Sequence, residues 1–116
     1  MSDVTIYHNP RCSTSRAVLA LIRETGTEPT IVKYLEDPPS REELAALIRD
    51  SGLAPRQALR RREKLYKELG LDDPGLTEEA ALDAMVANPV LIERPFVRAA
   101  SGSRLARPAE TVRELL

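Results

Sequence analysis

The chain has 116 residues, of which 42% are hydrophobic and 30% charged, values typical of one folded domain. Seventeen basic and eighteen acidic residues give a net charge of −1, which lacks the cationic excess typical of nucleic-acid-binding proteins. The longest uncharged apolar run, Ala17–Ile22, is far shorter than the roughly 20 residues of a membrane span. The single cysteine, Cys12, excludes an internal disulfide and a cysteine-cluster zinc site. No signal-peptide pattern opens the chain. We therefore expect a cytoplasmic monomer without metal, nucleic acid or membrane as partner.

The first part of the chain is predicted to form a β-α-β unit. Residues 4–7 are mostly β-branched or aromatic and indicate a strand. Helical spacing of apolar residues begins at Ser13, and Gly26 stands where a helix C-terminus favours glycine. Residues 30–35 indicate a second strand, which the prolines after Asp37 bring to an end.

The middle of the chain, about residues 40–89, is predicted to be a helical insertion. Ser40 and Glu43 form a capping-box pattern that begins a helix. A short helical turn is predicted from Pro55 to Arg60, and a further helix begins at Thr77.

The last part of the chain is predicted to add two strands and a helix. Residues 96–99 and 103–106 flank a turn at Gly102, and the closing helix runs from Pro108 through Leu115. The order β-α-β, helical insertion, β-β-α predicts an α/β thioredoxin-like fold that forms a single domain over residues 1–116. Arg94-Pro95 suits a strand edge or a cis bond, and the sequence does not decide between them.

Cys12 stands where the first strand gives way to the first helix. The unpaired N–H groups and positive dipole of a helix N-terminus favour a thiolate at such a position. Hydroxyls at residues 13–15 and the cations Arg11 and Arg16 add to this environment, and His8 adds charge if it is protonated. A thiolate at neutral pH is a competent nucleophile. A lone cysteine can equally be a buried apolar residue, and His8 can simply cap a turn.

Two neighbouring positions restrict the chemistry of this cysteine. Ser15 replaces the second cysteine of a Cys-x-x-Cys motif, so the chain carries no internal resolving thiol. Val18 stands where the phosphate loop of low-molecular-weight tyrosine phosphatases has arginine. An adduct on a single thiol must be released by water or by an external thiol, which indicates a partner of the glutathione type.

The sequence resembles the glutaredoxin-coupled arsenate reductases, a family of thioredoxin-like fold. The motif is His-Asn-Pro-x-Cys-x-Thr-Ser-Arg over residues 8–16, and the resemblance extends over nearly the whole chain. Further matching segments are residues 26–31, 34–39, 56–60, 66–71, 92–95 and 104–108.

The resemblance implies a role for five residues. Cys12 would attack arsenate to form a thiol–arsenate adduct, and His8 would help to keep this cysteine ionised. The arginines that bind the oxyanion would be Arg60, Arg94 and Arg107. Glutathione, the reductant, would attack the adduct, and glutaredoxin would remove glutathione as arsenite leaves. No bound cofactor is implied, and Arg94-Pro95 would be the cis-proline turn beside the thiol.

Two other functions remain open at this point. The chain can be a glutathione-linked monothiol redox or regulatory protein of the same fold that does not act on arsenate. It can also be an anion-binding module in which Cys12 is inert. For Arg60, which is followed by two more arginines, a solvated helix face is an alternative to oxyanion binding.

Overall fold

The computed structural model describes residues 4–116. Contacts divide the described chain into two compact units. The first comprises the residues up to Asp37 together with Arg94–Leu116, and the second comprises Pro38–Glu93. The predicted helical insertion, about residues 40–89, lies within the second unit. That the whole chain forms a single domain stays a prediction.

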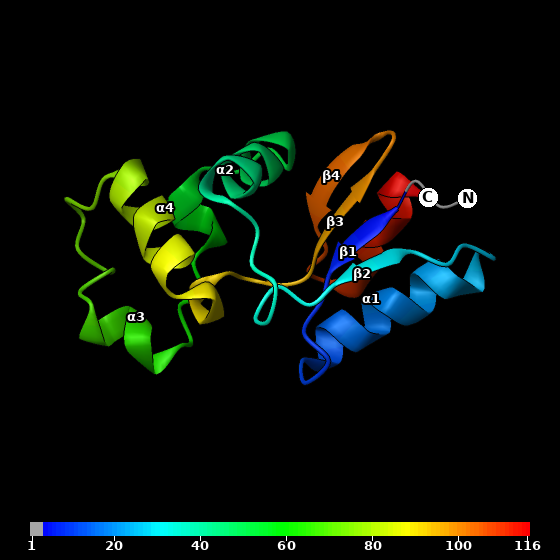
Figure 1. Ribbon diagram of the computed structural model, residues 1–116, viewed down its shortest axis with the longest axis horizontal. Helices are drawn as coiled ribbons and strands as arrows, with labels where there is room; N and C mark the ends of the chain where they lie inside the picture. The colour runs from blue at the N-terminus through cyan, green and yellow to red at the C-terminus, as the bar shows by residue number, and fades with distance from the viewer. Residues whose placement is uncertain (1–3) are drawn as a thin grey trace. The chain divides into compact units, whose positions relative to one another are not determined.

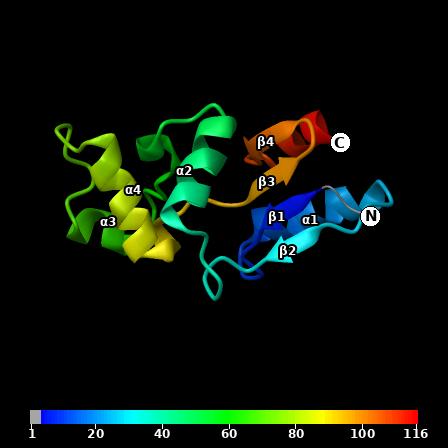
Figure 2. The same ribbon diagram turned by 45° about the horizontal axis from the view of Figure 1, so that its top comes forward.

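The first unit contains a four-stranded sheet with the order β2-β1-β3-β4 (Figures 1 and 2). β1 (Thr5–Tyr7) pairs in parallel with β2 (Thr30–Val32) and antiparallel with β3 (Phe96–Ala99), which pairs antiparallel with β4 (Gly102–Leu105). The helix α1 (Ser13–Glu24) connects β1 to β2, as a parallel pair requires. The predicted β-α-β and β-β-α segments therefore share one sheet.

One apolar core joins this sheet to its helices. Ile6 of β1 and Val97 of β3 are paired neighbours that point to the same side and are fully buried. Val18 and Ile22, one helical turn apart on α1, pack into the same cluster, as does Val112 of the 3₁₀ helix η3 (Ala109–Leu115). Burial of these side chains fixes the start of α1 relative to the strand ends, where Cys12 lies.

The second unit is helical and has its own buried residues. Its elements are α2 (Arg41–Asp50), the 3₁₀ helix η1 (Pro55–Ala58), α3 (Lys64–Glu68), α4 (Glu78–Ala87) and the 3₁₀ helix η2 (Pro89–Leu91). The predicted capping box is confirmed, because the Glu43 N–H donates to Ser40 Oγ at 3.1 Å and the Ser40 N–H to Glu43 Oε1 at 3.5 Å. Thr77 Oγ1 likewise accepts from the Ala80 N–H at the start of α4. No described helix has the length and apolar character to cross a membrane.

Two predicted boundaries were wrong. The strand predicted over residues 30–35 ends at Val32, because the Glu36 and Asp37 N–H groups both donate to the Lys33 carbonyl and form a turn there. The turn from Pro55 is a 3₁₀ helix that ends at Ala58, so Arg60 lies beyond it. The closing helix ends at Leu115, as predicted, and is a 3₁₀ helix. Arg94-Pro95 is a cis peptide, and so is Arg107-Pro108, which the sequence did not indicate.

Candidate active site

Cys12 is the residue that immediately precedes the first turn of α1. Its backbone is extended, with φ −91° and ψ 122°, and its carbonyl accepts the first helical hydrogen bond from the Arg16 N–H at 3.0 Å. The Cys12 N–H itself donates to the Asn9 carbonyl at 3.0 Å, which closes the loop between β1 and α1. This position directs the thiol toward the N–H groups of the first helical turn. The predicted placement of Cys12 at a helix N-terminus is confirmed.

The surroundings of Cys12 favour its thiolate form. Burial of the half-exposed side chain raises the pKa of the thiol, but four hydrogen-bond donors outweigh burial and hold the pKa below its ordinary value. In order of effect these donors are the Ser15 N–H, the Arg107 guanidinium, the Thr14 N–H and the Arg94 guanidinium. Each of them stabilises the charged sulfur more than the neutral thiol.

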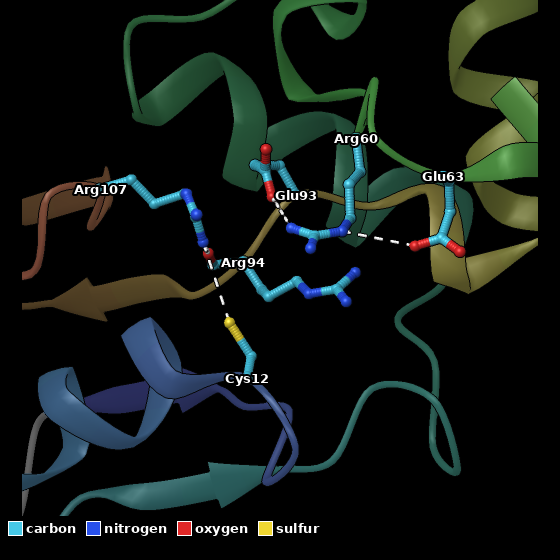
Figure 3. Close-up of polar contacts among 6 residues, drawn as sticks. All are labelled: Cys12, Arg60, Glu63, Glu93, Arg94 and Arg107. Atoms are coloured by element: carbon cyan, nitrogen blue, oxygen red, sulfur yellow. Dashed lines mark hydrogen bonds and ion pairs between the residues drawn. The ribbon is translucent and has the colours of Figure 1, made fainter.

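Arg107 reaches the thiol from the other end of the chain. Its Nη1 lies 3.8 Å from Cys12 Sγ and donates to the Arg94 carbonyl at 2.9 Å, as the dashed lines in Figure 3 indicate. The contact to the Arg94 carbonyl fixes the direction of the guanidinium. The unit therefore brings Cys12, Arg94 and Arg107 together, three of the five residues predicted for the site.

His8 contacts Ser15, one of the three hydroxyl residues predicted to surround Cys12. His8 Nδ1 lies 2.6 Å from Ser15 Oγ, and the same oxygen accepts the Asn9 N–H at 3.1 Å. Both side chains are buried, Ser15 completely. The Ser15 N–H supports the thiolate of Cys12, so His8 is connected to Cys12 through Ser15. The sequence signal for this link was a hydroxyl residue three positions after the cysteine, on the inward side of the helix.

The surroundings of His8 decide its charge state, which the sequence left open. Burial, followed by the positive charges of Lys33, Arg23 and Arg16, holds the pKa of His8 below its ordinary value of 6.5. The ring is therefore largely neutral at pH 7, and the thiolate is stabilised by N–H groups and arginines rather than by an imidazolium. A neutral ring protonated on Nε2 accepts at Nδ1 the proton of the Ser15 hydroxyl.

Arg60 belongs to the second unit, where it is held by carboxylates. Its Nη1 donates to Glu93 Oε1 at 2.8 Å, and its Nε lies 3.4 Å from Glu63 Oε2 (Figure 3). The Arg60 side chain is only 16% exposed, so the alternative of a solvated helix face does not describe it. Its participation in a site with Cys12 stays a prediction.

Space for a small ligand adjoins the start of α1. An open cavity of about 530 Å³ is lined by Ser13, Thr14, Ala17, Arg107, Pro108 and Ala109. Ser13, Thr14 and Arg107 are the polar residues of this lining. Within residues 4–116, no group of three or more His, Cys, Asp or Glu side chains is placed to hold a metal.

The arrangement places a thiol of lowered pKa beside two arginines. A thiolate repels an approaching oxyanion, and arginines beside the sulfur offset that repulsion and align the two groups. The four-stranded sheet, the cysteine at the start of α1 and the cis-proline before β3 together define the class of thioredoxin-like α/β proteins with one reactive thiol.

Comparison with known proteins identifies the family within this class. The model of the ArsC family matches residues 7–115. An arsenate reductase of Rhizobium meliloti is 56% identical over 113 residues, which cover 97% of this chain and 81% of that protein. The uncharacterized protein YfgD of Escherichia coli is 49% identical over 115 residues, 98% of this chain and 97% of that protein. The solved structure of an arsenate reductase from Vibrio cholerae superposes with a TM-score of 0.94 at 47% identity, covering 99% and 98% of the two chains.

The chain belongs to the ArsC family. The predictions of the family and of the thioredoxin-like α/β fold are both confirmed.

Proposed function

We propose that this protein is an arsenate reductase in which Cys12 is the nucleophile that attacks arsenate. Membership of the ArsC family and 56% identity to an arsenate reductase support the activity. The observation that carries the role of Cys12 is its thiol at the start of α1, where the Ser15 N–H and Arg107 lower its pKa. Such a thiol is ionised to a larger extent at neutral pH than an ordinary cysteine, and only the thiolate attacks arsenic.

The reaction balances with two external thiols. The Cys12 thiolate attacks arsenate, a sulfur–arsenic bond forms, and an oxygen leaves as water after protonation. Arsenic is still As(V) in this adduct. Glutathione thiolate then attacks the Cys12 sulfur, the sulfur–arsenic bond breaks, and its electron pair stays on arsenic, which leaves as arsenite, As(III). A mixed disulfide between Cys12 and glutathione remains, and a glutaredoxin thiol takes up the glutathione to regenerate the Cys12 thiolate.

The arginines bind and polarise the oxyanion in this proposal. Arg107 and Arg94 both act on the Cys12 sulfur, so an arsenate bound for attack on this sulfur comes within reach of the same guanidinium groups. Planar guanidinium donors fit tetrahedral oxyanions with paired N–H contacts. Arg60 is included on the basis of the resemblance to the family. His8 is a positioning residue, since its side chain bonds to Ser15 and the Ser15 N–H bonds to the sulfur.

The partners follow from the chemistry of a single reactive thiol. Cys12 is the only cysteine of the chain, so a second thiol must come from outside. Glutathione as reductant and glutaredoxin as protein partner supply it, and a cytoplasmic location keeps both reduced. We expect the chain to act as a monomer and to need no resident cofactor.

Coupled turnover tests the proposal. Purified protein is mixed with arsenate, glutathione, glutaredoxin and glutathione reductase, and NADPH oxidation is followed at neutral pH. We expect oxidation that requires arsenate and both thiol donors and that Cys12→Ser abolishes. Absence of arsenate-dependent oxidation, with Cys12 still forming a mixed disulfide with glutathione, would contradict the proposal. It would indicate instead a glutathione-linked monothiol redox or regulatory protein of the same fold.

A further inference from the structure

We propose that Glu93 is a positioning residue for the oxyanion site, because it holds the guanidinium of Arg60. The inference rests on the proposed function in one respect, namely that Arg60 binds the oxyanion. The contacts that carry it lie within the second unit, between its residues 58–63 and 91–93. Neither Glu93 nor Glu63 was singled out by the sequence.

A short antiparallel backbone pairing places Arg60 and Glu93 on the same side of two chain segments. Leu59 and Ile92 form an isolated antiparallel bridge. Hydrogen bonds flank it on both sides, from the Arg60 N–H to the Leu91 carbonyl at 2.7 Å and from the Glu93 N–H to the Ala58 carbonyl at 2.8 Å. In this register Arg60 lies opposite Leu91.

The register makes Arg60 and Glu93 diagonal neighbours. Glu93 follows Leu91 by two residues, and its Oε1 reaches Arg60 Nη1 across the pairing at 2.8 Å. The two paired segments are anchored by Leu59, Leu91 and Ile92, which are at most 4% exposed. The backbone therefore presents the carboxylate to the guanidinium from a fixed position.

Two carboxylates contact different nitrogens of the Arg60 guanidinium. Glu93 Oε1 lies 2.8 Å from Nη1, and Glu63 Oε2 lies 3.4 Å from Nε. The exposed fractions are 16% for Arg60, 20% for Glu93 and 28% for Glu63, so these pairs are less screened by water than pairs on the surface. A guanidinium has five N–H groups, and these two contacts do not use all of them. Arg60 is thus oriented while donors remain for an oxyanion.

Orientation matters because an arginine has a long side chain with many rotamers. An unrestrained arginine loses this rotamer freedom when it binds an anion, which weakens binding. An arginine already held by a neighbouring residue has lost the freedom before the anion arrives, so binding costs less conformational entropy. Glu93 also directly precedes Arg94, so the residue that orients Arg60 is covalently joined to the residue that acts on Cys12. Glu93 touches no reacting atom in this scheme and acts only through Arg60.

The test is a double-mutant cycle on the full chain, with Glu93→Ala, Arg60→Ala and the double variant in the coupled arsenate assay. We expect E93A to raise KM for arsenate on the order of tenfold with a small change in kcat, within the range of coupling between contacting residues. In the Arg60→Ala background the same change should have no further effect. Glu93→Gln, whose amide oxygen still accepts a hydrogen bond, should restore most of the affinity.

A second measurement does not depend on turnover. The rate of Cys12 alkylation by iodoacetamide is measured at increasing arsenate concentrations. The arsenate concentration that halves this rate gives the affinity of each variant for arsenate. We expect E93A to require more arsenate for half protection than the wild type and Glu79→Ala, a control on the exposed face of α4, to match the wild type. Glu93→Met keeps the length of the side chain without the acceptor and replaces E93A if that variant does not fold.

The outcomes separate this inference from the proposed function. If the wild type turns over arsenate but E93A has unchanged or lower KM, Glu93 does not position Arg60 and this inference fails alone. Equal effects of E93A with and without Arg60 would also overturn it, because Glu93 would then act through another group. If the wild type shows neither turnover nor protection by arsenate, the proposed function fails and this inference with it.

Discussion

Arg107 Nη1 lies 3.8 Å from Cys12 Sγ across a sequence separation of 95 residues. The contact joins the turn after β4 to the start of α1, and the core of the first unit holds both elements. In the proposed reaction Arg107 therefore has two roles, because it stabilises the thiolate before the attack and binds the oxyanion during it.

Replacement of Arg107 should affect both roles. We expect Arg107→Ala to lower kcat/KM for arsenate by about 10²-fold, the scale for loss of one contact to a developing charge. The same variant should raise the pKa of Cys12, seen as a shift of the pH profile of iodoacetamide alkylation to higher pH. Arg61→Ala, an exposed arginine of the second unit, is the matched control and should leave both quantities unchanged. Wild-type kcat/KM in Arg107→Ala would refute the assignment.

Ser15 provides a second test of how the thiolate is maintained. Ser15→Ala keeps the N–H that faces the sulfur but removes the hydroxyl that His8 Nδ1 and the Asn9 N–H both contact. Two buried polar groups lose their partner, so we expect a loss of about 1–3 kcal/mol in the free energy of unfolding. Denaturant titration measures this loss.

The hydroxyl should also influence the nucleophile. We expect Ser15→Ala to slow Cys12 alkylation at pH 7, because the segment between His8 and Cys12 is no longer fixed. In a His8→Gln background the effect should be smaller, since the connection is already altered. An equal effect of Ser15→Ala in both backgrounds would show that the hydroxyl does not link these two residues.

Local signals in the sequence were sufficient for some helix boundaries but not for the contacts at the site. The capping box of Ser40 and the glycine after α1 each depend on a few neighbouring residues, and both were predicted correctly. The contact of Arg107 with Cys12 depends on strand order and on the packing of η3, which local patterns do not encode. Arg60 looked like a surface arginine because its partner Glu93 is 33 residues away.

The end of β2 illustrates the same limit. Tyr34 and Leu35 continue the run of aromatic and apolar residues that begins in the strand, which is why a longer strand was predicted. The structure turns at Lys33, and its carbonyl accepts two N–H groups from the residues that follow. The resemblance to a family, rather than periodicity, indicated the roles of His8 and the three arginines.

Variants of Cys12 and Arg94 should separate the reactivity of the thiol from the binding of arsenate. Cys12→Ser should abolish turnover, because a serine hydroxyl is not ionised at neutral pH without a strong base. Arg94→Ala should retain a mixed disulfide with glutathione but lower kcat/KM for arsenate by about 10²-fold. Mass spectrometry of the protein after incubation with oxidised glutathione separates these two losses. Failure of Arg94→Ala to form the mixed disulfide would mean that Arg94 is needed for the reactive thiol itself.

His8 predicts a pH dependence of stability whose sign follows from burial. The pKa of His8 is below 6.5 in the folded protein, chiefly through burial, and close to 6.5 in the unfolded chain. Below pH 6.5 the unfolded chain therefore binds more protons at this residue than the folded protein, and stability falls as pH falls toward the folded pKa. Above pH 6.5 the ring is neutral in both states, and this contribution is complete.

The comparison of wild type with His8→Gln isolates this contribution. Glutamine can accept the Ser15 hydroxyl proton but does not titrate. Between pH 6.5 and 5 we expect the wild type to lose stability more steeply than the variant, by at most about 1.4 kcal/mol per pH unit for one proton. Denaturant midpoints at pH 7.5, 6.5, 5.5 and 5.0 measure the difference, and the carboxylates common to both proteins cancel. Parallel curves for the two proteins would mean that His8 is equally protonated in the folded and unfolded states, and the neutral ring assigned to the site would be wrong.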